Sequence, residues 1–305
     1  MDQIRLKAYG KVNLGLDVIG KRPNGYHDVR MIMQTVQLFD RLDMKKIKNN
    51  GIFLETNLSY VPCNENNLVY KAIDLLKKEF KIKEGVQVSL EKHIPVSAGM
   101  AGGSSDCAAA LYGMNRMFSL GLTTRQLMEY GVQLGADVPY CIIRGTALSE
   151  GIGEVLTRVP PLPKCYIVIA KPAINVSTKF VYEHLDINTI KTHPDIDGMI
   201  KALKERSLEG VTSRMGNVLE EVTIPYHPII EDIKCQMLKM GAMNALMSGS
   251  GPTVFGIYTS LEKAKSALYS IRKMRLARQS YLVEPFHVRK HKKSNRKKVR
   301  GNEHE

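Results

Sequence analysis

A glycine- and serine-rich segment that runs straight into an alanine-rich stretch, at residues 95–111, constrains the fold of this chain most. The segment contains three glycines, Gly99, Gly102 and Gly103, and the adjacent serines Ser104 and Ser105. The glycines permit backbone angles that other residues avoid and let a ligand approach the main chain closely. The alanines predict a helix that begins at once, with one of the two serines as its cap. Because the free N–H groups and dipole of a helix start favour an anion, the segment predicts a phosphate-binding loop.

The loop differs from the two best-known phosphate-binding motifs. No Gly-Lys-Ser or Gly-Lys-Thr ends it, as in a Walker P-loop, and it lacks the Gly-x-Gly-x-x-Gly pattern of dinucleotide-binding folds. A nucleoside triphosphate would therefore be held without a P-loop lysine. The alternative for this segment is an ordinary junction between a loop and a helix.

Length and composition limit the class of protein. A chain of 305 residues can bury a sizeable core and is expected to form two domains. No apolar run approaches the roughly 18 to 20 residues that span a bilayer, and the N-terminus lacks the apolar core of a signal peptide. The five cysteines form no Cys-x-x-Cys pair, which is typical of reduced thiols, and the histidines have no metal-ligand spacing. These features predict a cytoplasmic protein with no membrane partner.

Positive charge gathers at the C-terminal end. The formal net charge is +14, and residues 289–300 contain eight Lys and Arg and no acidic residue. Residues 1–288 hold 36 basic and 28 acidic residues, a net charge of +8. The segment 287–305 has no periodicity, so we expect a disordered, solvated tail. The alternative is a weak, salt-sensitive contact of this tail with RNA or another polyanion, the one route by which nucleic acid would become a partner.

Strands and helices follow one another irregularly. Residues 11–18 alternate between apolar and polar, which predicts a half-buried strand with Lys11 and Asn13 on one face. Further strands are predicted at 86–90, 140–143, 166–170 and 280–283, and helices at 67–80, 105–118, 124–134, 178–185, 196–206, 228–240 and 261–274. The irregular order favours an α+β fold over a doubly wound parallel sheet.

Several residues outside the loop have the chemistry for phosphoryl transfer to an alcohol. Asp137 lies in a break flanked by glycine and proline, where a carboxylate can face a cleft and act as a general base. Lys11 would keep such a carboxylate ionised and stabilise developing negative charge. Taken singly, Asp137 is also compatible with capping a turn, and Lys11 with a solvent-facing strand. Tyr26 and His27 follow a tight turn and offer ring surfaces for stacking on a base, or form a structural pair.

Five short motifs occur together in a fixed order. They are Lys11-Val-Asn-Leu-Gly-Leu16, Pro23-Asn-Gly-Tyr-His27, Pro95 to Ala109, Leu134-Gly-Ala-Asp-Val-Pro139 and Leu246 to Gly256. Jointly they resemble the galactokinase–homoserine kinase–mevalonate kinase–phosphomevalonate kinase superfamily across residues 1–286. The set is most similar to the branch that phosphorylates a cytidine diphosphate-linked methylerythritol in the non-mevalonate isoprenoid pathway.

The resemblance implies an enzyme that uses ATP and Mg²⁺. It implies that Lys11 and Asp137 are the catalytic pair. The ATP phosphates would be wrapped by Pro95, Val96, Ser97, Ala98, Gly99, Met100, Ala101, Gly102, Gly103, Ser104 and Ser105. The magnesium ligands are not implied, although Ser105 is a candidate.

The resemblance also assigns the acceptor side of the site. Tyr26 and His27 would stack on the substrate's cytosine, and Asn13 would contact the substrate. Thr178 would line the methylerythritol pocket. The segment 249–253 would lie against the glycine loop and complete the site.

The implied architecture has two domains. An N-terminal domain like ribosomal protein S5, residues 1–160, would bind ATP and carry the catalytic pair. A smaller ferredoxin-like domain, residues 161–286, would lie on the substrate side. The prolines at 160–163 would mark the boundary, and the tail at 287–305 extends past the usual end of the family.

Two alternatives stay open at this point. A sister kinase acting on mevalonate, phosphomevalonate or homoserine would have little use for the Pro23–His27 element. An RNA-binding or regulatory protein on a retired kinase scaffold would suit the basic tail, but it would not need Lys11, Asp137 and the glycine loop intact.

Overall fold

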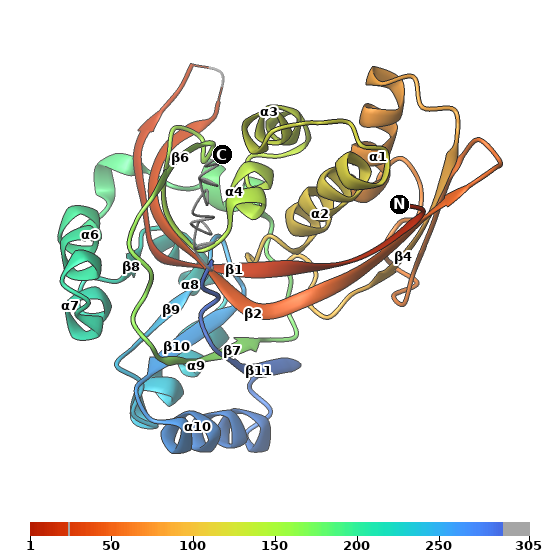
Figure 1. The fold of residues 1–305 in the computed structure, drawn as a ribbon. Helices are drawn as coiled ribbons and strands as arrows, with labels where there is room; N and C mark the ends of the chain where they lie inside the picture. Colours follow the sequence, from red (N-terminus) through yellow and green to blue (C-terminus); the bar gives the residue numbers. More distant parts are fainter. Residues whose placement is uncertain (24, 289–305) are drawn as a thin grey trace, which may run out of the picture.

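The structure, a computed structural model, describes residues 1–23 and 25–288, which form two β-sheets with helices packed against them (Figure 1). The predicted α+β fold is confirmed. Among the described residues, no helix combines the length and apolarity needed to cross a membrane. The predicted basic tail, apart from residues 287–288, lies outside the described residues.

A long antiparallel pair, β1 and β2, forms the centre of the first sheet. The sheet order is β3-β4-β2-β1-β8, and β5 pairs with both β2 and β6. The strands are β1 (Gln3–Lys21), β2 (His27–Ile47), β3 (Ile52–Thr56), β4 (Gly85–Glu91), β5 (Thr146–Glu150), β6 (Val155–Arg158) and β8 (Gly216–Asn217). The alternation at 11–18 marks only the middle of β1, which pairs with β2 over its whole length. Residues 3–8 also alternate, and residues 11–18 are buried throughout rather than half-buried, because this part of the strand is covered on both faces.

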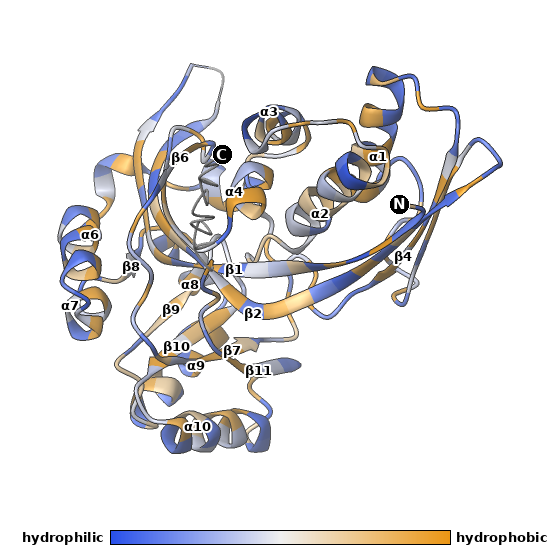
Figure 2. Ribbon diagram, viewed as in Figure 1, coloured by the Kyte–Doolittle hydropathy of each residue, from blue (hydrophilic) through white to orange (hydrophobic). Residues whose placement is uncertain are grey.

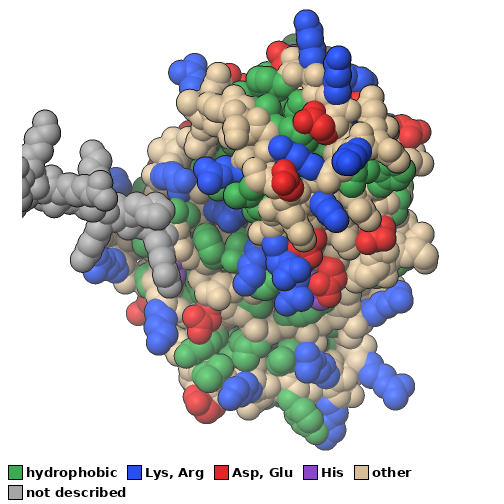
Figure 3. Space-filling model, turned by 45° about the vertical axis from the view of Figure 1, so that its right-hand side comes forward, with side chains coloured by type: hydrophobic (Ala, Val, Ile, Leu, Met, Phe, Trp, Pro, Cys, Tyr) green, Lys and Arg blue, Asp and Glu red, His purple; other side chains and the backbone are tan. Residues whose placement is uncertain are grey.

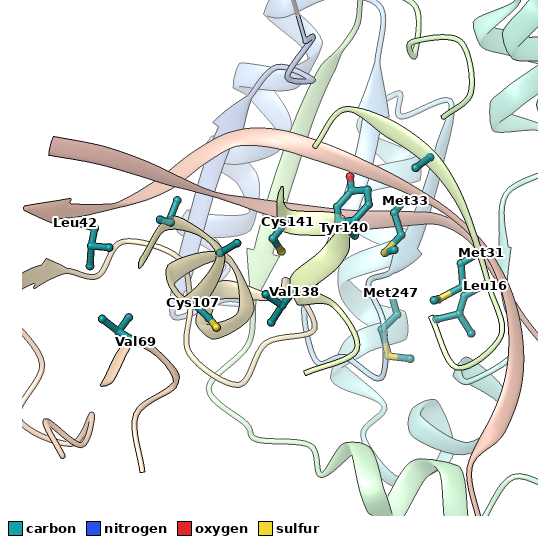
Figure 4. Packing of buried hydrophobic residues seen from close by; sticks show 14 of the residues in the cluster. Leu16, Met31, Met33, Leu42, Val69, Cys107, Val138, Tyr140, Cys141 and Met247 are labelled. Carbon is teal, nitrogen blue, oxygen red and sulfur yellow. The ribbon is translucent and has the colours of Figure 1, made fainter. Parts of the chain in front are cut away.

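The helices α1 (Leu68–Glu79), α2 (Gly102–Met117), α3 (Thr124–Leu134) and α4 (Val138–Ile143) cover one face of this sheet. Helix α2 packs on β1 and β2 and also contacts α1, α3 and α4. Its alanines and Cys107 are buried among side chains such as Leu42, Val69 and Val138 (Figure 4). Close packing around α2 fixes the start of this helix, where the glycine loop ends.

The prediction of a strand at 140–143 is wrong, because these residues belong to helix α4. A short apolar run cannot by itself distinguish a buried strand from a buried helix. Pro139 in the first turn favours the helix, since its ring fixes φ and its missing N–H needs no partner there. Tyr140 and Cys141 are buried on the side of α4 that packs into the core (Figure 4).

The second sheet is antiparallel, in the order β11-β7-β10-β9. It consists of β7 (Tyr166–Lys171), β9 (Asn244–Met247), β10 (Val254–Tyr258) and β11 (Gln279–Val283), with α9 (Ile229–Lys239) and α10 (Leu261–Lys273) packed on it. Helix α9 precedes β9 and helix α10 precedes β11, so the units occur in the strand-helix-strand-strand-helix-strand order of a ferredoxin-like fold. The ferredoxin-like prediction is confirmed.

An excursion between β7 and α9 connects the two sheets. It contains α5 (Thr178–Glu183), the 3₁₀ helix η1 (Ile187–Thr189), α6 (Ile196–Lys204), α7 (Leu208–Thr212) and α8 (Glu220–Tyr226), and its strand β8 pairs with β1 of the first sheet. Helices α6, α7 and α10 each have a hydrophobic and a hydrophilic side (Figure 2). The apolar side of α6 is buried, which anchors the excursion to the rest of the protein.

Candidate active site

A cavity of about 1330 Å³ opens between the glycine loop, the middle of β1, the N-terminal end of α4 and helix α5. Its lining includes every residue that the sequence predicts for the site except Met100 and Ser105. Residues far apart in the chain therefore converge on one cavity. Its volume exceeds that of typical pockets for a single small ligand, which are about 300–1,000 Å³, so it has room for a nucleotide and a second substrate.

Lys11 and Asp137 meet on the wall of this cavity. The Lys11 ammonium lies 3.9 Å from Asp137 Oδ2, and it donates to Asn13 Oδ1 at 2.7 Å and to the Gly99 carbonyl at 3.1 Å. The side chain of Lys11 is 6% exposed and that of Asp137 is 32% exposed. The ammonium is thus held between the glycine loop and a carboxylate that is open to the cavity.

The structure does not support the alternative roles of these two residues, a turn-capping Asp137 and a solvent-facing Lys11. Asp137 occupies the position just before α4, but its carboxylate makes no capping hydrogen bond to the helix. Lys11 is buried rather than solvent-facing, and its backbone N–H donates to the Met100 carbonyl at 3.1 Å. Both side chains are therefore available to a ligand in the cavity.

The glycine loop leads into α2 earlier than the sequence predicts. The helix begins at Gly102, and the residue before it, Ala101, has a left-handed backbone with φ of 54° and makes no side-chain cap. The expectation that Ser104 or Ser105 caps the helix is wrong, because both lie inside its first turn. The Ser105 hydroxyl is buried and donates to the Tyr9 carbonyl at 2.7 Å, and Ser105 does not line the cavity.

Met100 is the other loop residue outside the cavity lining. Its side chain is buried in the core, where a long unbranched residue fills the space behind the loop. Its contribution to the site is the carbonyl that accepts from the Lys11 backbone. The nine remaining residues of the predicted loop line the cavity, namely Pro95, Val96, Ser97, Ala98, Gly99, Ala101, Gly102, Gly103 and Ser104.

A second glycine-rich turn packs directly on the glycine loop, as the sequence predicts for segment 249–253. The Ser248 hydroxyl donates to the Gly99 carbonyl at 2.9 Å. A Cβ atom on Gly99, which has φ of +71°, would lie 2.0 Å from the Ser248 carbonyl oxygen. Only glycine at position 99 permits this close approach of the two loops. Next along this turn, the hydroxyl of Ser250 is 2.7 Å from that of Thr178, the first residue of α5.

Tyr26 and His27 differ in their surroundings. Tyr26 is 58% exposed at the edge of the cavity, whereas His27 is buried and its ring centroid lies 5.2 Å from that of Tyr182. The Nε2 atom of His27 is buried without a hydrogen-bond partner among the described residues. Burial lowers the pKa of His27, and the Lys21 charge acts in the same direction, so the imidazole is neutral near pH 7. A neutral ring with one free nitrogen can pair with a ligand in the cavity.

Tyr182 was not among the residues predicted from the sequence. It lies one turn after Thr178 on α5 and lines the same cavity. Burial raises the pKa of its hydroxyl, and the charge of Asp137 adds to the effect. The four-residue spacing from Thr178 was the available signal, because residues at that spacing share one helix face.

A buried charge cluster lies beside the start of α2, where a Cβ on Gly102 would be 3.3 Å from the Lys92 ammonium. The Lys92 ammonium contacts Asp40 Oδ2 at 2.5 Å and Asp106 Oδ2 at 2.7 Å, and both Lys92 and Asp106 line the cavity. The second oxygen of Asp40 accepts from the backbone N–H groups of His93 and Ile94, so Asp40 holds the chain just before the glycine loop.

Burial and mutual contact both shift the pKa values within this cluster. Burial lowers the pKa of Lys92, but the carboxylates of Asp106 and Asp40 outweigh it, so the pKa is raised. Burial raises the pKa of Asp106 well above its usual range, although the Lys92 charge opposes this. Asp106 Oδ1 has no hydrogen-bond partner among the described residues. Sequence reasoning missed the cluster, because its three members come from β2, the end of β4 and α2.

The fold and the site together define a class. The family described as GHMP kinases N terminal domain matches residues 67–145, and GHMP kinases C terminal matches residues 199–275. A crystal structure of homoserine kinase from Cytophaga hutchinsonii has a TM-score of 0.74 at 19% identity, covering 94% of this chain and 95% of the other, and so has the same fold. The chain has the architecture of a GHMP kinase, a class of enzymes that use ATP.

Closer relatives define the family within this class. The 4-diphosphocytidyl-2-C-methyl-D-erythritol kinase of Lachnospira eligens is 59% identical, over 94% of this chain and 99% of the relative. The enzyme of that name from Alkaliphilus metalliredigens is 47% identical, over 95% and 99%. A crystal structure of 4-(cytidine 5'-diphospho)-2C-methyl-D-erythritol kinase covers 93% of this chain and 100% of its own, with a TM-score of 0.79 and 27% identity. The chain belongs to the 4-diphosphocytidyl-2-C-methyl-D-erythritol kinase family.

Proposed function

We propose that this chain transfers the terminal phosphoryl group of ATP to the 2-hydroxyl of 4-diphosphocytidyl-2-C-methyl-D-erythritol. The observation that carries the proposal is the position of Lys11 and Asp137, 3.9 Å apart in a cavity that the glycine loop also lines. The names of the relatives supply the substrate, and membership of the family supports its transfer to this chain.

Asp137 is the partner of the attacking hydroxyl. In the transfer, a bond forms between the substrate oxygen and the γ-phosphorus while the bond from that phosphorus to the β-phosphate oxygen breaks. The hydroxyl proton leaves toward the Asp137 carboxylate, which either removes it or orients the hydroxyl until it departs. Lys11, held by Asn13 and Gly99, lies beside the position where negative charge develops and stabilises it.

The nucleotide is held by main-chain groups rather than by a P-loop lysine. The loop N–H groups and the start of α2 at Gly102 would hold the triphosphate. The described residues contain no group of three or more His, Cys, Asp or Glu that could hold a metal ion. This fits Mg²⁺, which keeps several waters and binds mainly through substrate phosphates, and the loop offers the hydroxyls of Ser97 and Ser104 at the cavity. Mg²⁺ would neutralise phosphate charge during transfer.

The cytidine end of the substrate would meet three aromatic side chains. Tyr26 at the rim and Tyr182 inside would cover the faces of the base, and His27 Nε2 would hydrogen-bond to its edge. Thr178 and Asn13 would contact the methylerythritol portion, since both line the cavity near the catalytic pair.

We also propose that residues 1–160 form the ATP-binding and catalytic domain and that residues 161–286 form the substrate-side domain. We assign the enzyme to the cytoplasm. Burial raises the pKa of the Cys107 thiol and raises that of Cys165 to about 12, which suits unreactive, reduced cysteines.

A coupled assay for ADP release tests the proposal. The wild-type protein should consume ATP with the cytidine substrate and not with mevalonate or homoserine. Asp137→Asn should lose about 10²- to 10⁴-fold in kcat while the Kd for ATP stays near normal. Asp232→Asn, on the exposed first turn of α9, is the matched control and should keep full activity. Near-normal turnover of Asp137→Asn would remove the catalytic assignment, and equal use of mevalonate would remove the substrate.

A further inference from the structure

A surface of positive charge lies on the second sheet, apart from the catalytic cavity. It is formed by the exposed side chains of Lys263, Lys265, Arg272, Lys273, Arg275 and Arg278, on α10 and the turn that leads to β11. We call this set the α10 basic surface. None of its members lines the catalytic cavity or forms an ion pair with another described residue. The chain contains no Asp or Glu from residue 263 to residue 283.

Three arginines of this surface surround a shallow hollow. Arg272, Arg275 and Arg278, together with Ser280 and Tyr281, line a concavity of about 380 Å³. Arg272 is fixed there, because its guanidinium donates to the Ser280 hydroxyl at 3.0 Å and to the Ser280 carbonyl at 2.9 Å. The planar guanidinium group matches the oxygens of a phosphate, so the hollow is suited to a phosphodiester.

An aromatic side chain lies among the cations. Tyr269 is 66% exposed, and it lies one helical turn from Lys265 and one turn from Lys273 on α10. Alternating cations and an exposed ring are typical of surfaces that bind single-stranded nucleic acid, where the cations follow the backbone and a base stacks on the ring.

The distribution of charge along the chain agrees with this feature. Residues 263–305 contain 14 basic and three acidic residues, so this segment holds +11 of the net charge of +14. After β11 ends at Val283, the described chain turns to the first sheet, where Pro285 pairs with Val36 and the Phe286 N–H donates to the Thr35 carbonyl, so the α10 basic surface depends on its own six cations. Figure 3 shows Lys and Arg side chains around the lower end of the molecule, at the height where Figure 1 places α10.

We propose that the α10 basic surface binds single-stranded RNA through its phosphate backbone. A membrane surface fits less well, because the apolar side of α10, with Ala264, Ala267 and Ile271, is buried against the protein and cannot insert into lipid. An acidic protein would use the cations but would not need the exposed ring of Tyr269. This site is separate from the kinase site, so its failure would leave the proposed function intact.

Fluorescence anisotropy with the full-length chain and a labelled mixed-sequence single-stranded RNA of about 30 nucleotides tests the proposal. The wild type should bind with an affinity that falls steeply between about 50 and 200 mM salt. Lys265→Glu with Lys273→Glu, and separately Arg275→Glu with Arg278→Glu, should each lower the slope of log affinity against log salt by about 1.4, since each single-strand phosphate contact contributes about 0.7. Tyr269→Ala should weaken binding at least about fivefold.

The matched control is Lys48→Glu with Lys83→Glu, which makes the same change of net charge at exposed lysines of the first sheet region. The control should bind RNA like the wild type, and all variants should keep wild-type kinase turnover. Wild-type affinity in both pairs of α10 variants would overturn the proposal and leave the tail as the RNA contact. An equal loss of RNA affinity in the control would show that only net charge matters, and it would overturn the proposal as well. Binding to vesicles of anionic lipid but not to RNA would overturn it in favour of a membrane surface.

Discussion

Substitution of Gly99 by alanine should separate the packing of the two glycine-rich turns from ordinary backbone strain. Gly99 has φ of +71°, and its added Cβ would lie 2.0 Å from the Ser248 carbonyl oxygen. Real Cβ contacts essentially never fall below 3.0 Å, so the loops must separate by at least 1.0 Å. The obstacle is main chain, which cannot rotate away as a side chain can.

The displacement would act on the catalytic lysine. The Gly99 carbonyl accepts from the Lys11 ammonium and from the Ser248 hydroxyl, so a shift of the loop moves Lys11 relative to Asp137. A misplacement of about 1 Å can cost about 10²-fold in rate, and the left-handed backbone of an alanine costs about 1–2 kcal/mol of stability. We expect Gly99→Ala to lose about 10²-fold in kcat/KM.

Gly121→Ala is the matched control. Gly121 also has φ of +71°, but no heavy atom lies within 4 Å of its added Cβ. Gly121→Ala should lose about 1–2 kcal/mol in the free energy of unfolding, measured by urea denaturation. Gly99→Ala should lose more than this, because its Cβ also meets the Ser248 main chain, and only Gly99→Ala should lose turnover in the coupled assay. If the two variants retain the same activity, the close approach of the loops does not position Lys11 and the reasoning fails.

Two further predictions concern buried polar groups. Asp40→Ala should lower the free energy of unfolding by about 3–5 kcal/mol, because it removes one carboxylate from Lys92 and leaves two backbone N–H groups unpaired. The control Asp74→Ala breaks an exposed ion pair with Lys78 and should lower it by less than about 1 kcal/mol. Similar losses in urea denaturation would contradict the structural role of Asp40. The pKa of His27 is lowered from 6.5, so its neutral form stabilises the folded state above that pH, and this contribution is lost as the pH falls through 6.5 toward the folded pKa. Wild-type Tm should therefore fall more than that of His27→Gln between about pH 7 and 5, and parallel curves would count against burial of a neutral imidazole.

Much of the local structure could be predicted from the sequence, because it depends on neighbours along the chain. Helix α3 has the predicted bounds, 124–134, with a capping box between Thr123 and Gln126. Helix α1 begins after Asn67, which caps it. The glycine loop and the order of the motifs were sufficient to indicate the class of enzyme and its substrate.

Where local signals conflicted or were weak, the prediction failed. The apolar run of α4 predicts a strand, and the serines at 104 and 105 predict a cap, but the structure has a helix at Val138–Ile143 and no side-chain cap at the start of α2. In both cases the conformation depends on which groups the tertiary structure places next to the segment. A buried surface on α2 accepts α4, and the Tyr9 carbonyl accepts the Ser105 hydroxyl.

By itself, the sequence indicated which residues are suited to phosphate binding and phosphoryl transfer and where most of the helices lie, since these follow from residue type and short-range spacing. Only the tertiary structure decided that Lys11 lies against Asp137, that the Ser248 turn closes on Gly99, and that Lys92 joins two buried carboxylates. Each of these contacts joins segments that are distant in the chain. Sequence spacing carries no information about such distances, because they are set by sheet pairing and by the packing of α2 on the sheet.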